Sequence, residues 1–134
     1  MDLKQRAAKL LHDFKGDNYL FGLDVLDRVG EWAVGYGETA LVISNTTHLR
    51  TVADQVIPSL EKHGVKLAGG KIVPGAGPNC PREDVYRIET YILHFKPACI
   101  IAIGGGSTLD AGKAANFLAA LGEYTPEIDP YFGT

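Results

Sequence analysis

Hydrophobic and polar positions follow two different periods along this chain. Unbroken apolar runs occupy 40–43 and 99–103, and such runs are typical of strands buried on both faces of a parallel sheet. Apolar residues spaced three and four positions apart predict amphipathic helices over 2–15, 49–60 and 81–95. The pattern therefore predicts both strands and helices, with 99–103 as the central strand.

Weaker patterns fill the intervals between these elements. We predict a short strand at 19–21 and a helix that follows Gly22 and ends before Gly35. A third strand, over 65–73, is interrupted by two glycines, and a last helix follows residue 106. Strands that alternate with helices indicate βαβ units with parallel strands.

The predicted fold class is α/β. At 134 residues the chain has the length of one domain, which we place over 1–134. We expect a three-layer, Rossmann-like domain with a mainly parallel sheet and helices on both faces. The helix at 1–15 is an addition to this domain, and 122–134 is a turn-rich tail. In such sheets ligands bind beyond the carboxyl ends of the strands, which brings the exits at 45–47, 75–81 and 104–107 together.

The exit after 99–103 has the strongest chemical signal. Gly104, Gly105 and Gly106 remove every Cβ from the turn, so positive φ is accessible and a ligand can approach the backbone. Ser107 and Asp110 have capping-box spacing, which places the helix start at or next to Ser107. The N–H groups of that first turn can bind a phosphate. The alternative is that the glycines only allow close packing and Ser107 only caps the helix.

Two better-known motifs do not fit this turn. A Walker loop needs a glycine where Ser107 stands and a Ser or Thr where Ala114 follows Lys113. A nucleophile elbow needs a glycine at the position of Leu109. Ser107 is therefore predicted to be a phosphate-binding or capping residue and not a nucleophile.

Composition narrows the function classes. The net charge of −3 offers no general attraction for nucleic acid or anionic membrane, and no apolar stretch approaches the roughly 20 residues of a membrane span. The two cysteines, Cys80 and Cys99, are isolated, and 1–4 do not open a signal peptide. We predict a cytoplasmic protein without nucleic-acid or membrane partners.

Several motifs resemble one known family. They are Gly104-Gly105-Gly106-Ser107-x-x-Asp110-x-x-Lys113, the Pro78-Asn79-x-Pro81 turn, the Phe21-Gly22 start, and the spacing from 42–45 to the glycines. From about Tyr19 the chain resembles the N-terminal dinucleotide-binding domain of the iron-containing (group III, metal-dependent) alcohol dehydrogenases. That family is related to glycerol dehydrogenase and dehydroquinate synthase.

The resemblance implies NAD or NADP as the cofactor. The residues it assigns to cofactor binding are Asn45, Asn79, Gly105, Gly106, Ser107 and Asp110. Gly105, Gly106 and Ser107 would hold the pyrophosphate, and Asn79 would lie near the nicotinamide. Asn45 stands where NAD-using relatives tend to have an Asp on the adenine ribose. Because Asn lacks the charge that repels a 2′-phosphate, the choice between NAD and NADP stays open. Asp110 is as well explained by capping as by cofactor binding.

The resemblance also implies a metal that this chain does not bind. Family members hold iron or zinc in a helical C-terminal domain with one Asp and two or three His, and we expect this chain to end before it. None of the four histidines has metal-ligand spacing to another; they are His12, His48, His63 and His94. No catalytic or metal-binding residue is predicted here.

Three functions follow from these motifs. The first is the cofactor domain of an NAD(P)-dependent alcohol dehydrogenase, inactive alone, whose full-length form oxidises a small alcohol or reduces an aldehyde. The second is a lyase domain like dehydroquinate synthase, disfavoured because 107–110 lack that group's bulky residue and second glycine. The third is a stand-alone nucleotide-binding module. A homo-oligomer is compatible with each of the three.

Overall fold

A three-stranded parallel sheet forms the centre of the computed structural model, which describes residues 1–45 and 50–121. The strands are β1 (Thr39–Ser44), β2 (Lys66–Leu67) and β3 (Cys99–Ile103), in the spatial order β2-β1-β3. The chain therefore adds β2 on one side of β1 and then crosses to add β3 on the other side. This reversal of direction creates a topological switch point between β1 and β3.

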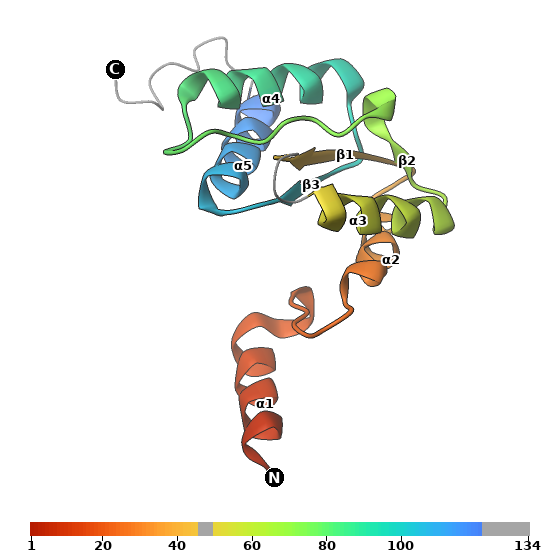
Figure 1. The fold of residues 1–134 in the computed structure, drawn as a ribbon, viewed down its shortest axis with the longest axis vertical. Coiled ribbons are helices and arrows are strands. Elements are labelled where there is room, and N and C mark those ends of the chain that lie inside the picture. The colour runs from red at the N-terminus through yellow and green to blue at the C-terminus, as the bar shows by residue number, and fades with distance from the viewer. Residues whose placement is uncertain (46–49, 122–134) are drawn as a thin grey trace.

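Helices cover both faces of the sheet, as Figure 1 shows. On one face, α2 (Val29–Ala33) and α3 (Arg50–Lys62) pack against alternate residues of β1, including Ala40 and Val42. On the other face lie α4 (Arg82–Phe95) and α5 (Gly106–Leu121). The predicted three-layer α/β architecture is confirmed.

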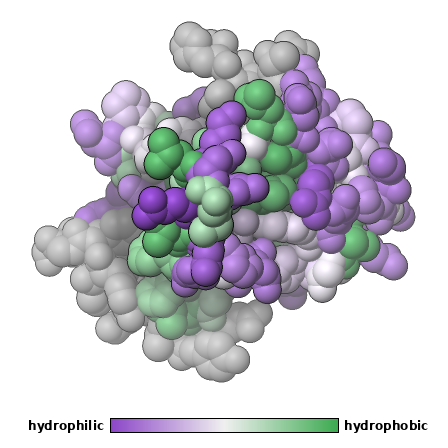
Figure 2. Space-filling view, turned by 90° about the horizontal axis from the view of Figure 1, so that it is seen from below, coloured by the Kyte–Doolittle hydropathy of each residue, from purple (hydrophilic) through white to green (hydrophobic). Residues whose placement is uncertain are grey.

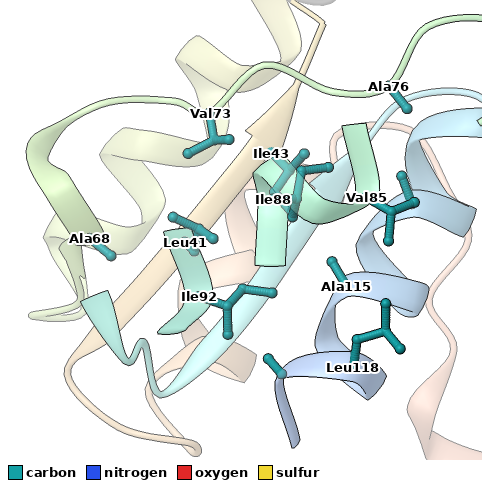
Figure 3. Packing of buried hydrophobic residues seen from close by; sticks show 12 residues of the cluster. Leu41, Ile43, Ala68, Val73, Ala76, Val85, Ile88, Ile92, Ala115 and Leu118 are labelled. Carbon is teal, nitrogen blue, oxygen red and sulfur yellow. The ribbon is translucent and has the colours of Figure 1, made fainter. Parts of the chain in front are cut away.

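Each face has its own hydrophobic core. Figure 3 shows the core beneath α4 and α5, where Leu41 and Ile43 of β1 lie among side chains from the two helices. The helical members that Figure 3 labels are Val85, Ile88, Ile92, Ala115 and Leu118. Gly112 lets α5 approach the sheet, because a Cβ there would lie 3.3 Å from the Cβ of Ala102.

The central strand is β1 and not β3. Ala40, Leu41, Val42 and Ile43 are all 0% exposed, whereas every residue of β3 is half-buried and the strand pairs only with β1 among the residues described. The prediction that 99–103 is central and buried on both faces is therefore wrong. The apolar run correctly predicted a strand, but it could not distinguish an edge position from a central one.

The third predicted strand is much shorter than the pattern over 65–73 indicated. β2 has two residues and is followed by a 3-10 turn, η3 (Ala68–Gly70), in which Gly69 and Gly70 have φ of 69° and 66°. The chain returns to the sheet only at Val73, which forms a single bridge with Ile43. The glycines thus end the strand because they adopt left-handed backbone conformations.

The N-terminal region differs most from the prediction. Helix α1 (Leu3–Lys15) is present and begins with a capping box between Asp2 and Gln5. The predicted strand at 19–21 is wrong, since 3-10 turns η1 (Gly16–Asn18) and η2 (Leu26–Arg28) flank an irregular segment. The predicted helix after Gly22 is α-helical only in α2. No helix within 1–45 or 50–121 is long and apolar enough to cross a membrane.

Candidate functional site

An open cleft of about 280 Å³ lies at the carboxyl ends of the strands, at the switch point between β1 and β3. Its lining comes from all three predicted exits, as far as they are described. The lining residues are Asn45, Ala76, Gly77, Pro78, Gly105, Gly106, Ser107 and Thr108. Thr46 and Thr47 lie outside the described residues. The sheet topology therefore brings together segments that are up to 63 positions apart in sequence.

The glycine turn leads directly into helix α5. The helix begins at Gly106, next to Ser107 as predicted, and its first intrahelical bond runs from the Leu109 N–H to the Gly105 carbonyl at 3.1 Å. Ser107 thus lies inside the first turn and not at the cap. The expected capping box with Asp110 is absent from this geometry, because both residues lie past the helix start.

The three glycines have different roles. None of them has a positive φ, so the turn does not use the left-handed conformations that are accessible to glycine. A Cβ on Gly104 would lie 2.9 Å from the Cβ of Thr108, so this glycine is needed for packing. A Cβ on Gly105 or Gly106 would meet no atom within 4 Å. Because both glycines line the cleft, they leave room for a ligand to approach the helix N-terminus.

Thr108 connects the three walls of the cleft, although it was not among the predicted site residues. Its side chain is on α5, is 2% exposed, and accepts hydrogen bonds from the Ala76 N–H at 3.3 Å and from Nδ2 of Asn45 at 3.4 Å. A Cβ on Gly75 would lie 2.5 Å from Thr108 Oγ1, so the loop passes close to the hydroxyl. The available sequence signal was its position four residues after Gly104, whose missing Cβ leaves room for the Thr108 side chain.

Asn45 fixes the second wall of the cleft. Besides its contact with Thr108, Nδ2 donates to the Ala76 carbonyl at 2.9 Å. The side chain is half-buried, and its amide nitrogen is directed to protein atoms. Asn45 therefore holds the end of β1 to the 74–81 loop, and its Oδ1 is the atom that can accept a hydrogen bond from a ligand.

The first turns of α4 anchor the 74–81 loop. The Gly77 N–H donates to Asp84 Oδ2 at 2.9 Å, and Arg87 pairs with Asp84 Oδ1 at 2.9 Å. Arg87 also donates to the carbonyls of Pro74 and Gly75. The hydrogen bonds from the Gly77 N–H and from Arg87, together with the positive charge of Arg87, lower the pKa of Asp84 below its usual value. Asp84 is thus held as a carboxylate that orders one wall of the cleft.

Two predicted cofactor residues lie outside the cleft lining. Asn79 is exposed at the tip of the loop, where it and Cys80 have φ of 63° and 51°. Asp110 is 69% exposed and lies 3.9 Å from Lys113 Nζ. Burial, followed by the charges of Asp110 and Asp84, raises the pKa of the Cys80 thiol. At neutral pH this thiol is therefore protonated and a weak nucleophile.

None of the described residues that line the cleft has a charged side chain. An anion there would interact mainly with the backbone N–H groups that open α5 and with the positive end of its dipole. Three of the four histidines lie elsewhere: His63 contacts the Ser59 carbonyl, His94 contacts the Phe95 ring, and His12 lies near Asp17. His48 lies outside the described residues. Within the described part of the chain, no three His, Cys, Asp or Glu residues are grouped so that they could hold a metal ion.

The sequence profile of the iron-containing alcohol dehydrogenases matches residues 16–132, which is most of the chain and includes all three walls of the cleft. The chain belongs to this family. The match confirms the resemblance drawn from the glycine motif. Helix α1, in contrast, lies outside the matched residues.

Individual relatives agree with this assignment. Glycerol dehydrogenase from Pseudomonas putida is 32% identical over 99 residues, which cover 74% of this chain and 26% of that protein. NADPH-dependent butanol dehydrogenase from Clostridium saccharobutylicum is 36% identical over 61 residues, which cover 46% of this chain and 15% of that protein. The crystal structure of NADH-dependent butanol dehydrogenase A from Thermotoga maritima superposes with a TM-score of 0.67 at 27% identity. The superposition covers 81% of this chain and 26% of that one. The chain thus spans about a quarter of the length of the glycerol dehydrogenase it matches.

Proposed function

We propose that this chain is the cofactor-binding domain of an NAD(P)-dependent alcohol dehydrogenase. The observation that carries the proposal is the pair of glycines, Gly105 and Gly106, whose Cβ positions are open and which line a cleft at the N-terminus of α5. Membership of the iron-containing alcohol dehydrogenase family supports the same assignment. A lyase function and a stand-alone module are not favoured, because the matched relatives named above are dehydrogenases.

The residues of the cleft fit a pyrophosphate. Gly105, Gly106 and Ser107 would donate backbone N–H groups to its oxygens. Because the described lining residues are uncharged, the helix dipole is the electrostatic attraction that they supply. Thr108 and Asn45 would keep the opposite wall at a fixed distance. A bound nicotinamide supplies hydride acceptance or donation, while the protein supplies binding and orientation.

The cofactor would extend from this turn in two directions. Oδ1 of Asn45 would accept a hydrogen bond from the adenine ribose, and Asn79 would lie toward the nicotinamide end. Asp110 would act indirectly, through its pair with Lys113 at the outer side of the first turns of α5. We propose that both NAD and NADP bind, since none of the described residues lining the cleft is a carboxylate that would repel a 2′-phosphate. The two butanol dehydrogenases named above differ in the same respect, one being NADH-dependent and the other NADPH-dependent.

The alcohol chemistry would need more than this chain. Iron or zinc would be held outside the chain and would polarise the oxygen of a small alcohol or aldehyde. We therefore expect the isolated chain to bind cofactor weakly and to show no turnover, and we propose a cytoplasmic location for the whole enzyme. An assay with added iron or zinc, NAD or NADP, and a series of small alcohols tests the second expectation. Clear turnover by the chain alone would contradict it.

Titration calorimetry with NAD and NADP tests the cleft assignment. Gly106→Val should abolish binding, because the added side chain would occupy the open space where the pyrophosphate is expected. Ala120→Val is the matched control, since it adds a β-branched side chain to an exposed position of the same helix, far from the cleft. If Gly106→Val binds as tightly as the parent chain, the phosphate assignment is wrong.

A further inference from the structure

Helix α1 presents an apolar stripe that nothing in the described structure covers. Leu3, Leu10 and Phe14 are 82%, 69% and 80% exposed, and no residue of α1 is buried. The helix projects away from the sheet and its helices (Figure 1). Figure 2, seen from the side on which α1 projects, shows apolar side chains exposed beside hydrophilic ones. An exposed stripe of this kind is typical of an interaction surface.

The spacing within the stripe indicates helix pairing. Leu3, Ala7, Leu10 and Phe14 are four, three and four positions apart, which is the repeat of a coiled-coil seam. Arg6 directly precedes Ala7, and Asp13 directly precedes Phe14. Both charged residues therefore border the same edge of the seam. Gln5, in contrast, lies on the side of the helix opposite the seam.

We propose that α1 pairs antiparallel with α1 of a second copy of this chain. In that arrangement Leu3 packs opposite Phe14 of the other copy, and Ala7 packs opposite its Leu10. Every layer then combines a larger side chain with a smaller one, as close packing requires. Both ends of the seam are filled in the same way because the pair is symmetric.

The charges beside the seam select this orientation. In the antiparallel pair, Arg6 of each copy lies near Asp13 of the other, which gives two ion pairs of opposite charge. In a parallel pair, Arg6 would lie near Leu11 and Asp13 would lie near Asn18, beyond the end of α1, and neither would meet an opposite charge. The antiparallel arrangement also places the two sheet domains at opposite ends of the helix pair, where they do not collide.

A groove beside the seam enlarges the apolar surface. It has a volume of about 530 Å³ and lies between α1 and the irregular segment after η1. Leu11, Tyr19 and Phe21 line it, and Phe21 is 79% exposed. Because Leu11 borders the edge of the seam opposite Arg6 and Asp13, the paired helix would cover part of this groove as well. The proposal is independent of cofactor binding, since α1 lies outside the family match and far from the cleft.

Sedimentation velocity of the full 134-residue chain, from micromolar to millimolar concentration, measures the pairing. We expect a monomer–dimer equilibrium. Arg6→Glu gives a chain with two acidic residues beside the seam, and Asp13→Arg gives a chain with two basic residues. Each variant alone should dissociate about tenfold more readily than the parent chain. An equimolar mixture of the two variants should regain the dimer, because each acidic position then meets a basic one.

Controls separate this pairing from other causes of association. Gln5→Glu also adds negative charge to α1 but lies opposite the seam, and Glu can keep the capping box with Asp2, so the dimer of this variant should be unaffected. Circular dichroism should show an unchanged fold in all variants, because they alter exposed residues of α1. A monomeric parent chain would overturn the proposal, including one that binds anionic phosphatidylserine vesicles through α1. Dimers that persist in Leu10→Glu, or a mixture that stays monomeric, would overturn it too.

Discussion

At the scale of single residues, Asn45 combines a structural role with a proposed cofactor role. Its Nδ2 donates to Ala76 and Thr108, while its Oδ1 is proposed to accept from a ribose hydroxyl. The sequence did not predict the contacts with Ala76 and Thr108, because a residue after a strand shows no partner from a distant loop. A substitution of Asn45 is therefore expected to change the stability of the fold as well as cofactor binding.

The cofactor preference of the chain tests the proposed role of Asn45. We expect NAD and NADP to bind within tenfold of each other, a difference below about 1.4 kcal/mol. Asn45→Asp should shift the preference to NAD, because a carboxylate repels the 2′-phosphate. It should also destabilise the fold by about 1–3 kcal/mol, because a carboxylate cannot donate to the Ala76 carbonyl. Calorimetry and urea unfolding measure the two effects.

Asn116→Asp is the control for this substitution, because it makes the same chemical change. Asn116 is exposed on α5 and does not line the cleft. It should change neither the cofactor ratio nor the stability by a measurable amount. A folded Asn45→Asp chain with the parent cofactor ratio would show that Asn45 has only its structural role.

Thr108 is the second residue whose importance only the structure shows. Thr108→Val keeps the shape of the side chain but removes the acceptor for the Ala76 N–H. We expect a loss of about 1–3 kcal/mol in the free energy of unfolding, because a buried donor is left without its partner. Thr90→Val is the control, since Thr90 is exposed and donates only to the Tyr86 carbonyl within its own helix. Urea unfolding that shows equal effects for both variants would contradict the assigned role.

At the scale of elements, α4 acts as the support of the 74–81 loop. Its apolar side was predicted from the spacing of Val85, Ile88 and Ile92, and all three are buried. Its polar side holds the loop through Asp84 and Arg87. That second function could not be predicted, because Asp and Arg three positions apart are equally typical of a solvated helix surface.

The lowered pKa of Asp84 predicts a pH dependence of stability. Because the folded pKa lies below the unfolded value of about 3.9, ionised Asp84 stabilises the fold fully above that pH. This stabilisation is lost as the pH falls through the lowered folded pKa. Asp84→Asn should therefore destabilise the chain by about 1 kcal/mol at pH near 7, and the difference should shrink in acid.

Urea unfolding of the parent and Asp84→Asn chains between neutral and acid pH measures this effect. Glu83→Gln is the control, because Glu83 is exposed and lies in the same first turn of α4. It should change stability by less than about 0.5 kcal/mol. A difference for Asp84→Asn that stays constant with pH would show that the Asp84 charge does not hold the loop.

At the scale of the whole molecule, β1 divides the interior into two hydrophobic cores. Leu60 belongs to the core on the α3 face and Ile88 to the core on the α4 face, with exposures of 1% and 0%. We expect Leu60→Ala to cost about 2–5 kcal/mol and Ile88→Val about 0.5–1.5 kcal/mol. In the double variant the two losses should add to within about 0.5 kcal/mol, because the residues share no contacts across the sheet.

Urea unfolding of the two single variants and the double variant provides the test. Ile88→Val combined with Leu118→Ala is the comparison, because both of those residues lie in one core and should couple. A strong coupling between Leu60 and Ile88 would mean that the sheet does not separate the cores.

The sequence by itself determined the elements with strong periodicity, the α/β class and the glycine turn. Helices α1, α3, α4 and α5 and strands β1 and β3 lie where their apolar patterns predicted them. A pattern along one element records which of its sides is buried, and this information is local. The 19–21 strand failed because three apolar residues do not specify burial, and Phe21 is exposed.

Only the tertiary structure decided which strand is central and which side chains join the cleft. The order β2-β1-β3 leaves β3 half-buried although its sequence is as apolar as that of β1. Thr108 meets Asn45 across 63 positions and Ala76 across 32. Strand neighbours and hydrogen-bond partners at such separations depend on how whole elements pack. No local pattern of polar and apolar residues contains that information.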